Sequence, residues 1–130
     1  EASLAEAGLA LLPLFVGDWT SDAGYRAAAT ISPDATAVFC GNDQMALGLV
    51  HGLADRGIRV PQDISVVGFD DVPEAAHYLP PLTTISQDFA RIGELAVEVL
   101  LDQIAGGERA PVPAIEPALV VRASTAPPRP

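Results

Sequence analysis

Short apolar runs alternate with helical patterns along most of the chain. Residues 37–40 and 64–69 are continuous runs of β-branched and aromatic side chains, typical of strands buried on both faces of a parallel sheet. Three further runs, residues 9–16, 82–85 and 115–121, also favour strands. Helices that alternate with strands form crossovers between parallel neighbours. The pattern therefore predicts an α/β fold, a doubly wound and mainly parallel sheet with helices on both faces.

Each of the three longer helical patterns follows a side chain that can cap a helix N-terminus. The predicted caps are Thr20 or Ser21, then Asp43, then Asp88. The helix after Asp88 is predicted to be the longest. Its apolar residues recur at helical spacing, so they form one apolar face.

The size and cysteine content of the chain limit its class. With 130 residues and 49% hydrophobic content it makes one domain, which can bury roughly two-thirds of its unfolded surface. No apolar stretch reaches the ~18 residues of a membrane span, and the first four residues lack the basic start of a secretory signal. A single cysteine excludes an internal disulfide framework. We expect a soluble, cytoplasmic chain that does not bind membranes.

Charge excludes several activities. A net charge of −10 opposes binding to nucleic-acid phosphates, which requires clustered Lys and Arg. The seven basic residues are all arginine and are scattered. Because lysine is absent, a Schiff-base enzyme, a pyridoxal-phosphate site, a Walker A loop and a phospho-acceptor receiver domain are each incomplete. We expect no cofactor and no catalytic activity.

The two buried runs each end in side-chain oxygens, at the edge of a parallel sheet where ligands bind. Asn42 and Asp70 are the predicted ligand-binding residues, because amide and carboxylate groups can bind adjacent hydroxyls of a polyol. Asp43 is predicted to cap its helix instead, and Asp71 to cap a short helix near Pro73. In the alternative interpretation Asp70 is also only a cap.

Aromatic residues can supply a surface on which a sugar stacks. Trp19 follows a predicted strand in a polar loop, which favours stacking, although it can also pack at the base of its own helix. Gln87 and Phe89 are predicted to complete the hydrogen bonding and the stacking surface.

A nucleophile with a neighbouring base is a weaker interpretation. Cys40 lies inside an apolar run, and His51 lies more than two turns into the next helix. His77 lies too far along the sequence from Cys or a second His to indicate a metal site.

Four stretches in unbroken order resemble the inducer-binding domain of the lactose-repressor (LacI/GalR) family. They are VGDWT at residues 16–20, CGNDQMALG at 40–48, DISVVGFDD at 63–71 and PPLTTISQDF at 80–89. The resemblance implies the effector-binding and dimerisation part of a bacterial transcriptional regulator, in which an N-terminal helix-turn-helix, absent here, binds DNA. The pocket residues resemble those of lactose-responsive members more than purine-responsive ones, which implies a galactoside-like sugar as effector.

The resemblance also implies how the chain is organised. Residues 1–122 correspond to the C-terminal portion of a two-lobed domain, with lobe crossings at residues 87–89 and 111–115. The helix within residues 88–110 is expected to belong to the other lobe, and residues 123–130 to form a flexible tail. Without that lobe, the apolar face of this helix is expected to drive self-association.

A homodimer is the expected assembly. By resemblance its apolar anchors are Leu47, Tyr78 and Leu79, although Leu47 and Leu79 can equally be core residues. Two other classes stay open: a transport-type periplasmic sugar-binding protein, and a nucleoside- or sugar-processing hydrolase, which would have to show turnover.

Overall fold

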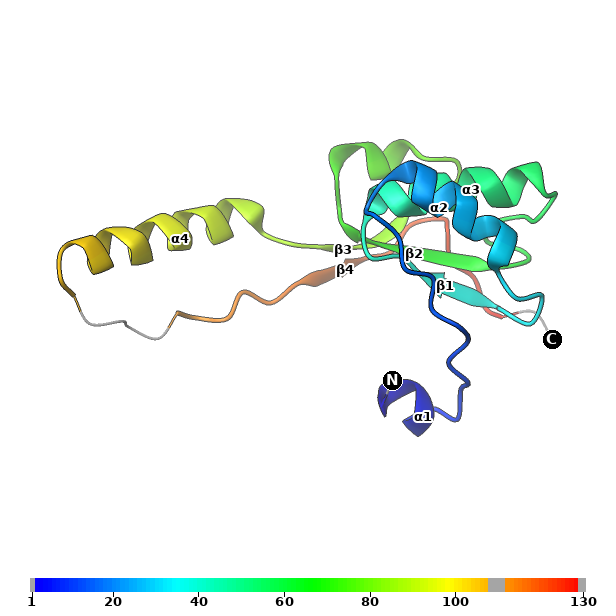
Figure 1. Cartoon of the computed structure of the whole chain (residues 1–130), viewed down its shortest axis with the longest axis horizontal. Coiled ribbons are helices and arrows are strands. Elements are labelled where there is room, and N and C mark those ends of the chain that lie inside the picture. Colours follow the sequence, from blue (N-terminus) through cyan, green and yellow to red (C-terminus); the bar gives the residue numbers. More distant parts are fainter. Residues whose placement is uncertain (1, 108–111, 129–130) are drawn as a thin grey trace.

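The computed structural model describes residues 2–107 and 112–128 (Figure 1). Its elements in chain order are α1 (Ala2–Glu6), α2 (Ser21–Ala27), the 3₁₀ helix η1 (Ala28–Thr30), β1 (Ala37–Phe39), α3 (Asp43–Asp55), β2 (Ser65–Asp70), the 3₁₀ helix η2 (Pro73–His77), β3 (Thr83–Ser86), α4 (Phe89–Ile104) and β4 (Ala118–Val120).

The strands form one sheet in the order β1-β2-β3-β4. The first three strands are parallel, and β4 runs antiparallel to β3. This confirms the predicted α/β class with a mainly parallel sheet. Figure 1 shows α2 and α3 on the same face. On the opposite face Phe39 is 63% and Leu119 59% exposed, so within the described residues packed helices cover one face and not both.

Helices α2 and α3 lie unusually close because glycines meet at their contact. A Cβ atom at Gly24 would collide with the carbonyl oxygen of Met45, and one at Gly48 with that of Ser21. Leu49, a residue of α3 beside this contact, is 2% exposed. The absence of a side chain at Gly24 and Gly48 therefore allows the close packing of α2 and α3, which both contribute residues to the hydrophobic core.

The prediction of a strand at residues 9–16 is wrong. All of these residues are described by the structure, and they form an extended segment without strand pairing. Leu12 and Phe15 pack against the core, whereas Leu14 and Val16 are more than four-fifths exposed. An apolar run becomes a strand only when a neighbouring strand pairs with its backbone, and here none does.

Helix α4 extends away from the body as an arm, with β3 leading out to it and β4 returning from it (Figure 1). Asp88 is the N-cap as predicted and accepts a hydrogen bond from the Arg91 N–H at 2.9 Å. Helix α4 ends at Ile104, inside the range 88–110 in which the helix was predicted; residues 108–111 lie outside the described part. None of the described helices is both long and apolar enough to cross a bilayer.

The prediction that residues 123–130 form a flexible tail is wrong for the first of these residues. Ser124 is fully buried; its hydroxyl donates to the Val66 carbonyl at 2.6 Å and accepts from the Thr83 N–H at 2.7 Å. Ala126 is hydrogen-bonded through its backbone to Ser65. The segment after β4 is thus held to β2 and β3 by hydrogen bonds. Residues 129–130 lie outside the described part.

Candidate functional site

The carboxyl end of β2 is a strained turn that we call the Asp elbow, residues Asp70 and Asp71. Their φ angles are +110° and +57°, in the region that side chains rarely adopt and that costs about 1–3 kcal/mol per residue. The elbow's two carboxylates contact different partners. Asp70 Oδ1 accepts from Gln87 Nε2 at 3.0 Å, and Asp71 Oδ1 accepts from Arg122 Nη2 at 2.7 Å. Asp71 is therefore paired with a cation, whereas the side-chain partner of Asp70 among the described residues is the neutral Gln87 amide, which leaves acceptor capacity for a ligand.

Asp43 does not cap its helix, which corrects the prediction. The cap of α3 is Asn42, and Asp43 is fully buried behind it. Asp43 Oδ1 accepts from the Thr84 hydroxyl at 2.6 Å and Oδ2 from the Val72 N–H at 2.9 Å. This carboxylate therefore joins α3 to β3 and to the residue that follows the elbow.

Asn42 is largely buried, and both ends of its amide have protein partners. Its Oδ1 accepts from the Met45 N–H at 2.8 Å, and its Nδ2 donates to the Trp19 carbonyl at 3.0 Å. Trp19 itself has φ +68° and is 66% exposed, so it is not a core residue. Its indole lies over Gly41, where a Cβ would stand 3.1 Å from Cζ3. Asn42 thus holds the loop that presents the indole.

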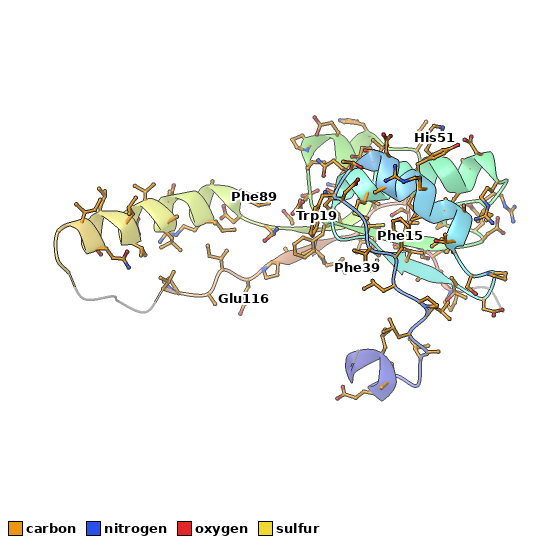
Figure 2. All side chains as sticks on the ribbon, viewed as in Figure 1. Phe15, Trp19, Phe39, His51, Phe89 and Glu116 are labelled. Carbon is orange, nitrogen blue, oxygen red and sulfur yellow. The ribbon has the colours of Figure 1, made fainter. Side chains whose placement is uncertain are left out.

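Figure 2 shows Trp19 on the side of the body from which the arm leaves, with Phe89 at the start of α4. Phe89 is 55% exposed, and its N–H donates to the Gln87 carbonyl at 2.9 Å. The structure therefore brings Asp70 and Gln87 into direct contact and joins Asn42 to Trp19. Phe89 is linked to Gln87 through the backbone.

The sequence interpretation missed two residues of this region, Asp43 as a buried link and Arg122 as the partner of Asp71. A basic residue just after the last strand was the available signal for Arg122, but its partner lies 51 residues away. No spacing rule predicts such a pair.

The nucleophile interpretation has no support from the geometry. Burial raises the pKa of the Cys40 thiol to about 12, with a further contribution from Asp43, so no reactive thiolate forms at neutral pH. The His51 ring instead lies near Asp55, 3.8 Å away, and against Tyr25. Within the described residues no three His, Cys, Asp or Glu side chains are placed to hold a metal ion.

The three predicted dimer residues differ in exposure. Leu79 is 88% and Leu47 40% exposed, so the alternative that they are core residues is wrong. Tyr78, by contrast, is 9% exposed and belongs to the hydrophobic core. Of the three, Leu47 and Leu79 are thus exposed and able to contact another molecule.

Comparison with known proteins gives one consistent result. The periplasmic binding protein-like domain family matches residues 1–125. The HTH-type transcriptional repressor PurR of Erwinia tasmaniensis is 42% identical over 130 residues, covering 95% of this chain and 38% of the repressor. A dimeric Lac repressor with a C-terminal deletion aligns with a TM-score of 0.87 and 36% identity, over 98% of this chain and 48% of that one. The regulator CelR in complex with cellobiose aligns with a TM-score of 0.85 and 36% identity, over 95% of this chain and 39% of that one. The chain spans less than half the length of each.

Proposed function

Because the chain belongs to the periplasmic binding protein-like domain family, in the form found in LacI/GalR regulators, we propose that it is the effector-binding part of a bacterial transcriptional regulator. It binds a small polyhydroxylated molecule and performs no catalysis. The related proteins are repressors and regulators by name, which favours this function over a transport-type binding protein. Such a regulator acts in the cytoplasm, on DNA bound by another part of the polypeptide.

The observation that carries the proposal is the pairing of Asp70 with Gln87 at the carboxyl end of the sheet, with the exposed Trp19 indole on the side of the body from which the arm leaves. A sugar offers hydroxyls that both donate and accept, together with apolar C–H faces. The free acceptor capacity of Asp70 suits the hydroxyls, and the Gln87 amide fixes the orientation of that carboxylate. Trp19, two-thirds exposed, suits the C–H face. Phe89 adds a second aromatic surface, and Asn42 acts by holding Trp19 in place.

A galactoside-like sugar is the effector class that we propose. The bound cellobiose of the CelR structure supports a sugar in general. The preference for galactosides depends on the combination of Trp19, Asn42, Asp70 and Gln87. A flat purine base would use the aromatic surface but leave most of the acceptor capacity of Asp70 unused.

The proposal also assigns a role to the arm. We assign α4 to the second lobe of a two-lobed domain, with the ligand held between the lobes. An effector changes the lobe arrangement only by binding one arrangement more tightly than the other. Two copies pair through the face that carries Leu47 and Leu79, so the change is passed to paired DNA-binding heads.

A ligand panel tests the function directly. Trp19 is the only tryptophan, so its fluorescence reports on this site alone. We would titrate the chain with methyl galactosides, cellobiose, ribose and purine bases. Asp70→Asn is the test variant, since Asn tolerates a positive φ better than Ala does. Asp34→Asn, in an exposed turn, is the control.

The expected result is a saturable fluorescence change with a sugar and a dissociation constant roughly tenfold or more higher in Asp70→Asn, because a hydrogen bond to a charged group contributes about 1.5–3 kcal/mol. Asp34→Asn is expected to match the wild type. A response to purines and not to sugars would reject the sugar assignment, and an unchanged affinity in Asp70→Asn would remove this residue from the site.

A further inference from the structure

The Asp elbow is tied to both strands that connect the body to the arm. Gln87, the partner of Asp70, is the residue that follows β3 on the way out to α4. Arg122, the partner of Asp71, lies two residues after β4, the strand that returns from the arm. Two neighbouring aspartates are thus each bonded to a residue that follows a different one of these strands, β3 for Asp70 and β4 for Asp71.

Arg122 is held by more than its ion pair. Its Nη1 donates to the Leu82 carbonyl at 2.8 Å, and its backbone N–H donates to the Thr83 hydroxyl at 2.9 Å. The side chains of Arg122 and Asp71 are each only 20% exposed. Charge-assisted hydrogen bonds in such a partly buried place are shorter and stronger than those between neutral groups. The guanidinium therefore offers Asp71 a fixed partner and not a mobile surface charge.

A second anchor lies on the other side of the elbow. The N–H of Val72 donates to the buried Asp43 carboxylate, which also accepts from Thr84. A backbone with two consecutive positive φ angles persists only where its surroundings over-determine it. Asp43 fixes the residue after the elbow, and Arg122 fixes the side chain within it. In the part of the chain that the structure describes, the Asp70 side chain is held by the Gln87 amide and by no charged partner.

We propose that Arg122 is a positioning residue for Asp70: by clamping Asp71 it holds the strained elbow in the conformation that presents the Asp70 carboxylate beside Gln87. Its use in ligand binding rests on the proposed function, while the clamp itself does not. Because Gln87 follows β3, which leads out to the arm, and Arg122 follows β4, which returns from it, a change in how the arm leaves the body alters the position of Asp70. The elbow thereby links the site to the arm.

Nuclear magnetic resonance of the chain tests the clamp without any ligand. The readout is the Gln87 side-chain amide, together with the backbone amides of residues 70–72. Arg122→Gln is expected to shift these signals and to speed hydrogen exchange of the Gln87 amide severalfold. Arg91→Gln, which removes an arginine paired with Glu94 on the arm, is the matched control and is expected to leave them unchanged.

Arg122→Lys separates the clamp from a simple charge effect and serves if Arg122→Gln does not fold. A lysine keeps the charge but cannot donate to Asp71 and to the Leu82 carbonyl from one planar group. The clamp predicts that Lys restores the signals only in part. Wild-type signals in a folded Arg122→Gln or Arg122→Lys chain would overturn the proposal.

Ligand binding provides the second readout, with methyl β-D-galactoside as the probe. Arg122→Gln is expected to weaken its binding about as much as Asp70→Asn does, and the double variant no more than either single one, because both act through one carboxylate. Val66→Ala, a core truncation, lowers the melting temperature without this loss. If the wild type does not respond to the probe, the proposed function fails while the resonance experiment still decides the clamp. If the wild type binds and the two substitutions are additive, the positioning role is wrong.

Discussion

The side-chain amide of Asn42 donates to the backbone carbonyl of Trp19 at 3.0 Å, across 23 positions of sequence. The same side chain caps α3 by accepting from the Met45 N–H. One residue thereby sets both the start of a core helix and the loop that presents the indole. This relationship gives Asn42 a structural role in the folded chain.

Substitution of Asn42 separates its two roles. A serine can still cap α3 but cannot reach Trp19, so Asn42→Ser is expected to retain most stability while changing the Trp19 emission spectrum. Asn42→Ala loses the cap as well, which costs about 1 kcal/mol more. Urea unfolding and fluorescence of both variants check this. Equal spectra for Asn42→Ser and the wild type would contradict the loop-holding role.

The helix pair α2 and α3 is expected to tolerate no side chain at its contact. In Gly48→Ala the new Cβ meets the carbonyl oxygen of Ser21, and backbone cannot move aside cheaply. We expect a loss of about 1–3 kcal/mol in the free energy of unfolding.

Gly93→Ala is the matched control for this helix contact. Gly93 lies within α4, and a Cβ there meets nothing within 4 Å. Since alanine is the better helix former, this variant is expected to be up to about 1 kcal/mol more stable. Denaturation of both variants in urea gives the comparison, and a Gly48→Ala chain as stable as the wild type would show that the helices can separate.

Several elements were predictable from the sequence because their causes are local. The caps Thr20 and Asp88 are side chains that bond to the backbone three residues on, and their helices begin where predicted. The prediction gave the N-cap of α3 to Asp43, whereas the structure gives it to Asn42, because both residue types cap helices well. Asp43 is instead bonded to Thr84 and Val72, which lie far along the chain, so the sequence near the helix does not indicate which residue is the cap.

In the candidate site, too, features with local causes were predictable and features that depend on distant residues were not. The position of Asp70 at the carboxyl end of a buried strand was predictable, because it depends on neighbouring residues. The partner of Asp71 was not, since Arg122 reaches it only after the arm has returned. Ser124 was assigned to a tail for the same reason: the bonds that bury it come from β2 and β3.

The buried thiol makes stability depend on pH in the alkaline range. The pKa of Cys40 rises from an ordinary 9.0 to about 12 in the folded chain. A raised folded pKa contributes stability that is complete below pH ~9 and is lost as the pH approaches ~12, because only the unfolded chain then releases the proton. The loss is at most about 1.4 kcal/mol per pH unit.

Two tyrosines also have a raised pKa, Tyr25 through its hydrogen bond to Asp55 and Tyr78 through burial. Cys40→Ala isolates the contribution of the thiol from theirs. The wild type is expected to exceed Cys40→Ala in stability at pH 8, and this difference is expected to narrow at pH 10.5. Urea midpoints at the two pH values give the measurement. A difference that stays constant would mean that the thiol titrates equally in both states.

Two exposed apolar surfaces can make this chain associate, and a charged substitution in each one distinguishes between them. Leu79 is 88% exposed on the body, and Leu101 and Ile104 on the arm are 60% and 75% exposed. If pairing follows the proposed regulator dimer, Leu79→Glu yields a folded monomer, whereas Leu101→Glu leaves the dimer intact. If the unpartnered arm drives association, the outcome reverses. Sedimentation velocity across a concentration series distinguishes the two, and circular dichroism verifies that each variant is folded. Because glutamate on an exposed position costs little stability, a change in mass reports the interface itself, and a wild type that stays monomeric at high concentration would reject both modes.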